Sequence, residues 1–152
     1  MIVSIDPHRL SFGDCSVTKL AVSDLHRIFG GPATVEHIRL RDGGTRFRES
    51  WPNKHLDVLR DEDQPDALCL SVGFPEKLET TNLRVRGSIV ADDEAAFKTT
   101  FPFAEKGIGH SYTVTVGNWR ITADFKKPSR MRGKGSCIYR IFRLIIHEDK
   151  PA

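Results

Sequence analysis

Two alternating segments, HSYTVTV and WRITADF, constrain the fold of this chain more than any other feature, because only Gly117-Asn118 separates them. Apolar and polar side chains take turns along both segments, as in strands with one buried face. A two-residue loop that begins with glycine suits a type II′ turn, which closes an antiparallel hairpin. The predicted register pairs Val116 with Trp119, Val114 with Ile121 and Tyr112 with Ala123.

Further strands and two short helices are expected along the chain. The segment CIYRIFRLIIH is apolar on both faces apart from Arg140 and Arg143, which favours a central strand. The sequence therefore predicts an α+β fold, with a curved, mainly antiparallel sheet and one or two short helices. The expected strands cover 2–5, 9–12, 56–59, 67–74, 83–91 and 137–147, and a short helix is expected at 94–99.

The clearest helix signal is SDLHRIFGGP. Ser23 can cap its start, and Leu25, Ile28 and Phe29 fall on one helical face. The following Gly30-Gly31-Pro32 ends it, because glycine permits the backbone conformation of a helix terminus and proline cannot continue a helix.

Length and composition fit one domain, residues 1–152, with 39% hydrophobic residues to form a core. The chain has no segment with the features of a signal peptide or a membrane span, so we expect cytoplasmic residence and no membrane partner. The three cysteines are far apart in the sequence, which favours free thiols over a disulfide framework.

No motif for catalysis or for metal binding stands out. The six histidines are scattered without metal-ligand spacing. Asp92-Asp93 fits a helix cap better than carboxylate chemistry, and Cys69 has no evident base. We therefore expect no catalytic residues, no metal and no cofactor.

Positive charge is concentrated in the segment RLRDGGTRFR, which holds four arginines and one acid. If Gly43-Gly44 forms the loop of a hairpin, the four guanidiniums share one face of the sheet. Like charges directly opposite are destabilising unless an anion lies over them. That anion can belong to a partner, and we expect at least two of the arginines to lack an intramolecular acid. Alternatively Asp42, Glu49 or an acid of a neighbouring strand neutralises them, or water solvates them.

A second basic segment is KKPSRMRGKGS, residues 126–136, which holds five cations and no aromatic residue. Together with the hairpin arginines and one strand arginine, it supplies the candidate partner-binding residues. These are Arg39, Arg41, Arg46, Arg48, Arg120, Lys126, Lys127, Arg130, Arg132 and Lys134.

The order of motifs over roughly residues 1–100 resembles the small cytoplasmic immunity proteins of bacterial polymorphic or secreted toxin systems. The resemblance lies in a short N-terminal hairpin, the helix end DLHRIFGGP, the strand RFRESW with Trp51, and the later segments LCLSVGF and LRVRGSIVADD. It implies a protein that acts by occluding a partner, without catalytic residues.

Charge and resemblance together predict a binding protein that neutralises a cognate toxin by covering its active site, through arginines that recognise an acidic surface of the toxin. The alternative is a nucleic-acid-binding module that uses the basic hairpin and the 126–134 loop to contact phosphates. The sequence leaves the oligomeric state and the chemistry of the toxin open.

Overall fold

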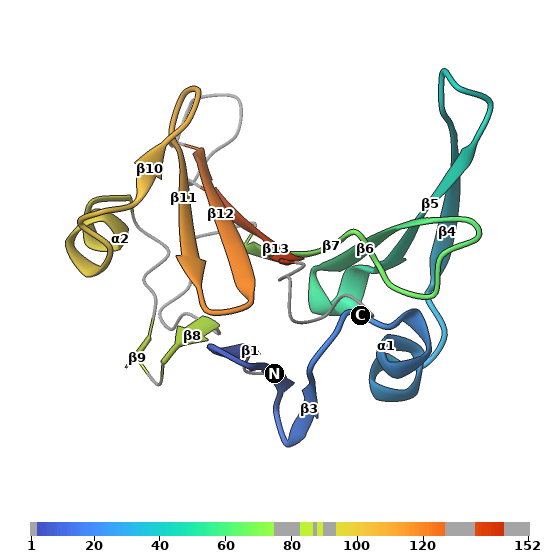
Figure 1. Cartoon of the computed structure of the whole chain (residues 1–152), viewed down its shortest axis with the longest axis horizontal. Helices are drawn as coiled ribbons and strands as arrows, with labels where there is room; N and C mark the ends of the chain where they lie inside the picture. Colours follow the sequence, from blue (N-terminus) through green and yellow to red (C-terminus); the bar gives the residue numbers. More distant parts are fainter. Residues whose placement is uncertain (1–2, 75–82, 87, 90–93, 127–135, 145–152) are drawn as a thin grey trace, which may run out of the picture.

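A computed structural model describes residues 3–74, 83–86, 88–89, 94–126 and 136–144. Over these residues the chain forms an eight-stranded sheet, a five-stranded sheet, two α-helices and one short 3₁₀ helix. Strands dominate and most pairs are antiparallel, which agrees with the expected class (Figure 1).

The large sheet is antiparallel throughout the described residues. Its central pair is β7 and β13, so the prediction that the CIYRIFR segment lies centrally is confirmed. The 3₁₀ helix Pro52–Lys54 connects β5 to β6. From edge to edge the strands are β10 (Glu105–Lys106), β11 (Ser111–Val116), β12 (Trp119–Lys126), β13 (Ser136–Arg143), β7 (Cys69–Phe74), β6 (Leu56–Asp61), β5 (Thr45–Trp51) and β4 (Thr34–Arg39).

The small sheet combines the N-terminal strands with a segment from the middle of the chain. In order its strands are β3 (Cys15–Val17), β2 (Arg9–Phe12), β1 (Val3–Asp6), β8 (Leu83–Val85) and β9 (Ser88–Ile89). The β1–β8 pair is parallel and the others are antiparallel. The single strand expected over 83–91 is interrupted at Arg86, whose φ of 52° lies in the left-handed region. Strand β3 was not predicted.

Both helices pack on the same face of the large sheet. Helix α1 (Val22–Phe29) buries Leu25 and Phe29, and the Phe29 ring meets Phe12 edge to face at 4.9 Å. Helix α2 (Glu94–Thr100) buries Phe97 against Tyr112, Phe125 and Tyr139.

The predicted end of α1 is correct and its predicted start is wrong. Gly30 follows the helix with a φ of 79°, and its N–H donates to the carbonyl of His26. Ser23 lies inside the helix, because the chain enters from the bridge between Ala21 and Asp66, and the cap residue Ala21 makes no side-chain hydrogen bond.

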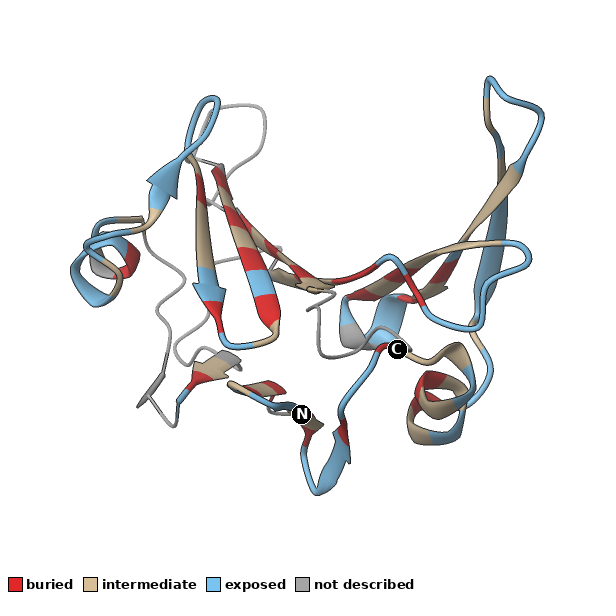
Figure 2. Ribbon diagram, in the orientation of Figure 1, coloured by how far each residue is buried: buried red, intermediate tan, exposed pale blue. Residues whose placement is uncertain are grey.

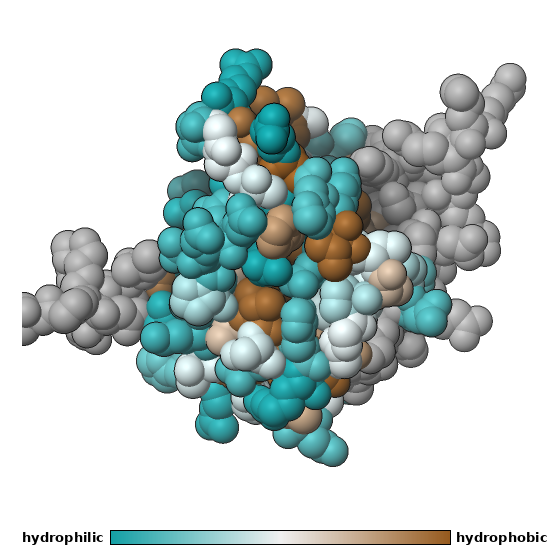
Figure 3. Space-filling view, turned by 90° about the vertical axis from the view of Figure 1, so that its right-hand side faces the viewer, coloured by the Kyte–Doolittle hydropathy of each residue, from teal (hydrophilic) through white to brown (hydrophobic). Residues whose placement is uncertain are grey.

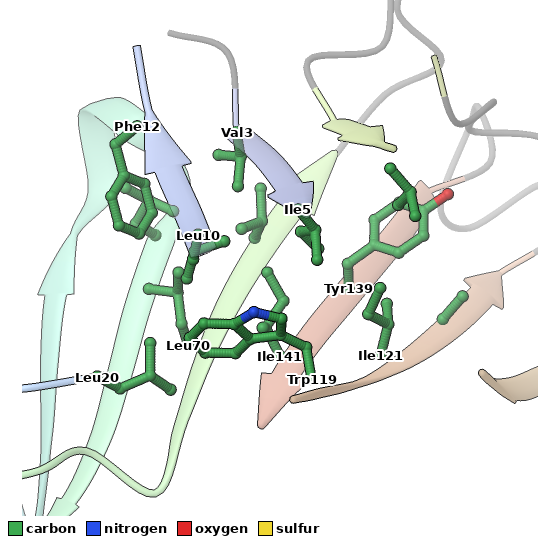
Figure 4. Packing of buried hydrophobic residues seen from close by; sticks show 14 of the residues in the cluster. Val3, Ile5, Leu10, Phe12, Leu20, Leu70, Trp119, Ile121, Tyr139 and Ile141 are labelled. Carbon is green, nitrogen blue, oxygen red and sulfur yellow. The ribbon is translucent and has the colours of Figure 1, made fainter. Parts of the chain in front are cut away.

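One core joins the two sheets, because alternate residues of the large sheet point toward the small sheet and the helices. Figure 4 shows Trp119, Leu70 and Ile141 of the large sheet pointing toward Ile5 and Leu10 of the small sheet. We call this side of the large sheet the packed face and the opposite side the open face. The packed face buries Trp51, Leu56, Val58, Leu70, Val72, Tyr112, Val116, Trp119, Ile121, Ala123, Tyr139 and Ile141.

The hairpin that most constrained the sequence has the predicted register. Val116 pairs with Trp119, Val114 with Ile121 and Tyr112 with Ala123, and Trp119 is fully buried. Gly117 has a φ of 56°, whereas Asn118 is not among the residues of positive φ, as a type II′ turn requires. A Cβ at Gly117 would collide with the backbone of Pro7, so the turn also needs glycine for its contact with the small sheet.

The hairpin of β4 and β5 does not have the predicted register. Instead of a Gly43-Gly44 loop, the chain turns through Arg41-Asp42-Gly43, with Gly43 at a φ of 91°. Gly43 N–H donates to the Leu40 carbonyl, and Leu40 N–H donates to the Gly44 carbonyl. This is the three-residue loop with a glycine bulge that also occurs in hairpins.

The altered loop separates the arginines that were expected to share a face. Arg39 pairs with Thr45, Ile38 with Arg46 and Glu36 with Arg48. Because side chains alternate along a strand, Arg46 and Arg48 lie on the open face, whereas Arg39 points to the other side and Arg41 lies in the turn. Directly opposed arginines are therefore avoided.

None of the described helices is long and apolar enough to cross a membrane.

Candidate functional site

The open face carries a row of polar side chains that crosses seven neighbouring strands. Each pair in the row is directly opposite in the sheet register. These residues are half-buried except for Thr34, which is exposed. In strand order, the row is Thr113, Thr122, Arg140, Ser71, Asp57, Ser50 and Thr34. No described helix or second sheet lies over this face (Figures 1 and 2).

The next positions on the open face mix arginines with apolar side chains. At one end, Arg120 lies between Thr115 and Phe142. Toward the other end, Arg48 lies between Glu36 and Leu59. Phe142 and Leu59 are only half-buried, in contrast to the apolar residues of the packed face.

Two of the open-face arginines have acidic partners. Arg46 Nε lies 2.8 Å from Asp61 Oδ1, and Arg48 Nη1 lies 3.4 Å from Glu36 Oε2. The alternative that neighbouring strands neutralise part of the basic hairpin therefore holds for this pair of arginines, although the acids are not Asp42 or Glu49. Asp42 instead accepts a hydrogen bond from the N–H of Gly44.

Arg120 and Arg140 have no ion pair or side-chain hydrogen bond to another described residue, and the same is true of Arg39 and Arg41. The structure thus places Arg46, Arg48 and Arg120 of the predicted set on one face and adds Arg140, which was not predicted. The sequence did contain a signal for Arg140, because an arginine in an otherwise apolar strand indicates a position that faces solvent or a partner.

A groove of about 770 Å³ lies on the open face at the β10–β13 end of the sheet. Its floor includes Arg120, Phe142 and the threonines of β11 and β12, and its rim is the loop from Thr100 to Glu105. Thr113 and Thr122 share a hydrogen bond of 3.3 Å between their hydroxyl groups. Phe103 on the rim is 97% exposed, which is unusual for so large an apolar side chain. Sequence reasoning missed this groove.

Cys69 lies on the open face but is buried. Burial raises the pKa of the Cys69 thiol, and this effect exceeds the opposing effects of the Ser71 hydrogen bond and the arginines Arg140, Arg48 and Arg46. A protonated thiol is a poor nucleophile. The surroundings of Cys69 therefore give no support to covalent chemistry at this position.

A buried carboxylate connects α1 to the large sheet on the packed face. Glu49 is 3% exposed, and its two oxygens lie 3.0 Å from His26 Nε2 and 3.1 Å from Arg60 Nε. The Arg60 guanidinium also lies over the Phe47 ring, 4.5 Å from its centroid. These contacts replace the water that the buried carboxylate of Glu49 has lost, and they hold α1 against the sheet. We therefore assign the cluster a structural role.

A second carboxylate cluster connects α2 to β11. Glu94 Oε1 accepts hydrogen bonds from Tyr112 Oη at 2.6 Å and from His110 Nδ1 at 3.1 Å. The hydrogen bond to Glu94, with burial second, raises the pKa of Tyr112. The proposed cap Asp92-Asp93 lies outside the described residues.

The remaining predicted cations belong to the second basic segment. Lys126 ends β12, and its side chain is not described. Lys127, Arg130, Arg132 and Lys134 lie outside the described residues, so their part in binding stays a prediction. Within the part of the chain that the structure describes, no three His, Cys, Asp or Glu side chains form a group that could hold a metal ion.

Comparison of the chain with protein-family models, with curated proteins and with solved structures gives no match.

Proposed function

We propose that this chain is a binding protein that neutralises a cognate toxin by occluding its active site, and that the groove end of the open face makes the contact. The observation that carries this proposal is the combination of an exposed Phe103 with Arg120 and Phe142 around one groove. Aromatic residues, phenylalanine included, and arginine are enriched in protein interfaces relative to the rest of the protein surface.

The chemistry of the groove fits a protein partner. Arg120 lines the groove, and Arg140 lies beside it on the open face, opposite Thr122. Neither arginine has an acidic partner among the described residues, so each is available for two parallel hydrogen bonds to a carboxylate. Phe103 supplies an apolar anchor, and the nearby threonine hydroxyls supply adaptable hydrogen bonds. An acidic surface with one protruding apolar side chain would complement this arrangement.

The toxin as partner comes from the resemblance of the sequence motifs to immunity proteins. An inhibitor that acts by occlusion needs affinity and shape but no catalytic group of its own. The large sheet is proposed to curve, so that both ends of its open face turn toward one partner. Residence in the bacterial cytoplasm, together with the toxin, belongs to the same proposal.

Nucleic-acid binding is less well supported by the charges of the open face. Two of its arginines are occupied by Asp61 and Glu36, and Asp57 and Asp124 add further negative charge on the same face. Phosphate binding needs a surplus of free cations, and affinity then falls steeply with salt concentration.

The test is co-expression with the product of the adjacent gene, followed by co-purification and a growth assay. Arg120→Glu combined with Arg140→Glu should abolish protection and weaken the complex at least about 30-fold, as expected when about 2 kcal/mol of binding free energy is lost. Arg9→Glu, at an exposed position of β2 in the small sheet, is the matched control and should protect like the wild type. Protection that survives the double reversal, or salt-dependent retention of nucleic acid without a protein partner, would refute the proposal.

A further inference from the structure

The two edges of the large sheet differ in a way that matters for binding. One edge is β10, which has only two residues. The other is β4, which has six residues and pairs only with β5 among the described strands. Short edge strands limit further strand pairing, whereas a long unpaired edge offers a template for it.

Hydrogen bonds in the hairpin show which backbone groups of β4 point away from the sheet. The N–H of Leu40 points toward β5, because it donates to the carbonyl of Gly44. The carbonyl of Thr45 points away from β4 toward β6, because it accepts from the N–H of Glu62. Because the direction alternates along an antiparallel strand, Glu36 and Ile38 direct their backbone groups to β5. Val35, His37 and Arg39 therefore direct their N–H and C=O groups outward, where no described residue pairs with them.

The β4 edge (residues 34–39) lacks several devices that commonly block strand addition. The strand TVEHIR contains no proline and no lysine, and its register with β5 runs without a bulge from Thr34 to Arg39. Nearly all of it is exposed, including Val35 at 45% (Figure 2). Seen from the hairpin side of the molecule, hydrophobic patches interrupt a mainly hydrophilic surface (Figure 3).

The charges beside this edge select the kind of strand that can pair with it. Arg39 at the end of the strand and Arg41 in the turn have no acidic partner among the described residues. Glu36 is already paired with Arg48. A strand that adds here meets the two free guanidiniums at one end and the exposed Val35 at the other.

We propose that the β4 edge is a docking site for an extended acidic segment of a partner protein, which adds to the large sheet as one more strand. In an antiparallel arrangement, an acidic side chain lies opposite Arg39 and an apolar side chain lies opposite Val35, four residues further along the partner. The backbone bonds to Val35, His37 and Arg39 provide affinity, and the side chains provide selectivity.

A second copy of this chain fits the edge less well. Two copies of β4 can pair antiparallel and symmetrically in two registers centred on the strand. The first register places Glu36 opposite Glu36. The second places His37 opposite His37 and Val35 opposite Arg39. Neither register places an acid directly opposite Arg39, and the first opposes like charges. The charges therefore favour a different, acidic partner.

The β4 edge and the groove lie at opposite ends of the large sheet, so either can bind when the other does not.

A phage-displayed library of random twelve-residue peptides, selected on the full chain, serves as the probe. We expect enriched peptides with an acidic residue four positions before an apolar one. Binding of a synthetic enriched peptide should weaken at least tenfold in Arg39→Glu and should be unchanged in Arg120→Glu.

Backbone pairing is tested by His37→Pro against His37→Ala. The proline removes an N–H that β5 does not use, so His37→Pro should fold like His37→Ala but lose at least tenfold in peptide affinity, whereas His37→Ala should retain it. Should His37→Pro fail to fold, amide hydrogen exchange of the wild type decides. Saturating peptide should then slow exchange at Val35, His37 and Arg39. Equal affinities of two folded variants, unchanged exchange, enriched peptides without acidic residues, or concentration-dependent dimers through β4 would overturn the proposal.

Discussion

At the residue scale, Trp119 shows how much of the stability depends on single side chains of the packed face. It is fully buried, and its indole N–H has no hydrogen-bond acceptor among the described residues. Trp119→Ala should lower the free energy of unfolding by about 3–5 kcal/mol, as truncation of buried aromatics does. Trp119→Phe should cost less than half of that, because it removes less volume and no satisfied polar group. Urea denaturation measures both, and equal losses would contradict the view that Trp119 stabilises the fold in proportion to the volume that it fills.

The cysteines provide a second prediction at this scale. Burial raises the pKa of Cys69, whereas Cys15 is exposed. Only the thiolate reacts with iodoacetamide, so Cys15 should be alkylated at least about tenfold faster than Cys69 at neutral pH. Mass spectrometry of the native protein after short reaction times gives both rates. In urea the alkylation rates of Cys15 and Cys69 should become similar. A fast reaction of Cys69 in the native state would contradict its described surroundings.

At the scale of elements, the β11–β12 hairpin depends on the glycine of its turn, because Gly117 combines a positive φ with a close approach to Pro7. Gly117→Ala should destabilise the protein by about 2–4 kcal/mol through backbone strain and overpacking. Gly107→Ala is the matched control, because its Cβ would meet Ser111 at an ordinary distance of 3.6 Å. Thermal unfolding gives the melting temperatures of the two variants. Similar values would mean that close packing of the turn against Pro7 does not require glycine.

The attachment of α1 to the large sheet depends on Glu49. Glu49→Ala should cost about 2–3 kcal/mol, because it leaves the partly buried Arg60 guanidinium and the His26 ring without the carboxylate that both contact. Glu36→Ala breaks an exposed ion pair on the same sheet and should cost at most about 1 kcal/mol. Urea denaturation followed by the fluorescence of the two tryptophans, of which Trp51 lies beside His26, reports on the loss. Comparable costs for the two variants would argue against a buried charge cluster.

The two hairpins also show where the sequence was sufficient and where it was not. The β11–β12 hairpin contains a single glycine in its loop, and only one two-residue turn fits that position. The sequence alone therefore determined the register. The other hairpin contains Gly43-Gly44, which fits both a two-residue loop and a three-residue loop with a bulge at Gly43. The choice between the loops moves Arg39 to the other side of the sheet relative to Arg46 and Arg48, so the predicted arginine face was wrong.

At the scale of the whole molecule, both helices and the small sheet cover the packed face, which leaves the open face for a partner. Alternation along single strands predicted which residues of β11 and β12 are buried. It could not predict that Arg120 lies beside Phe142 and Arg140, because the pairing of β12 with β13 arises from the order of strands in the sheet. Phe103 and the groove were missed for a second reason, since a loop residue carries no periodic signal.

The central claim is that this chain binds a protein partner through the groove, and the affinity of the complex with the product of the adjacent gene tests it most directly. Phe103→Ala and Ile108→Ala each remove an apolar side chain that is 97% exposed, but only Phe103 lines the groove. Neither change should alter stability. We predict that Phe103→Ala weakens the complex at least about 30-fold, as the loss of an interface hot spot does, while Ile108→Ala leaves it within about twofold. Equal affinities of the two variants would contradict the account.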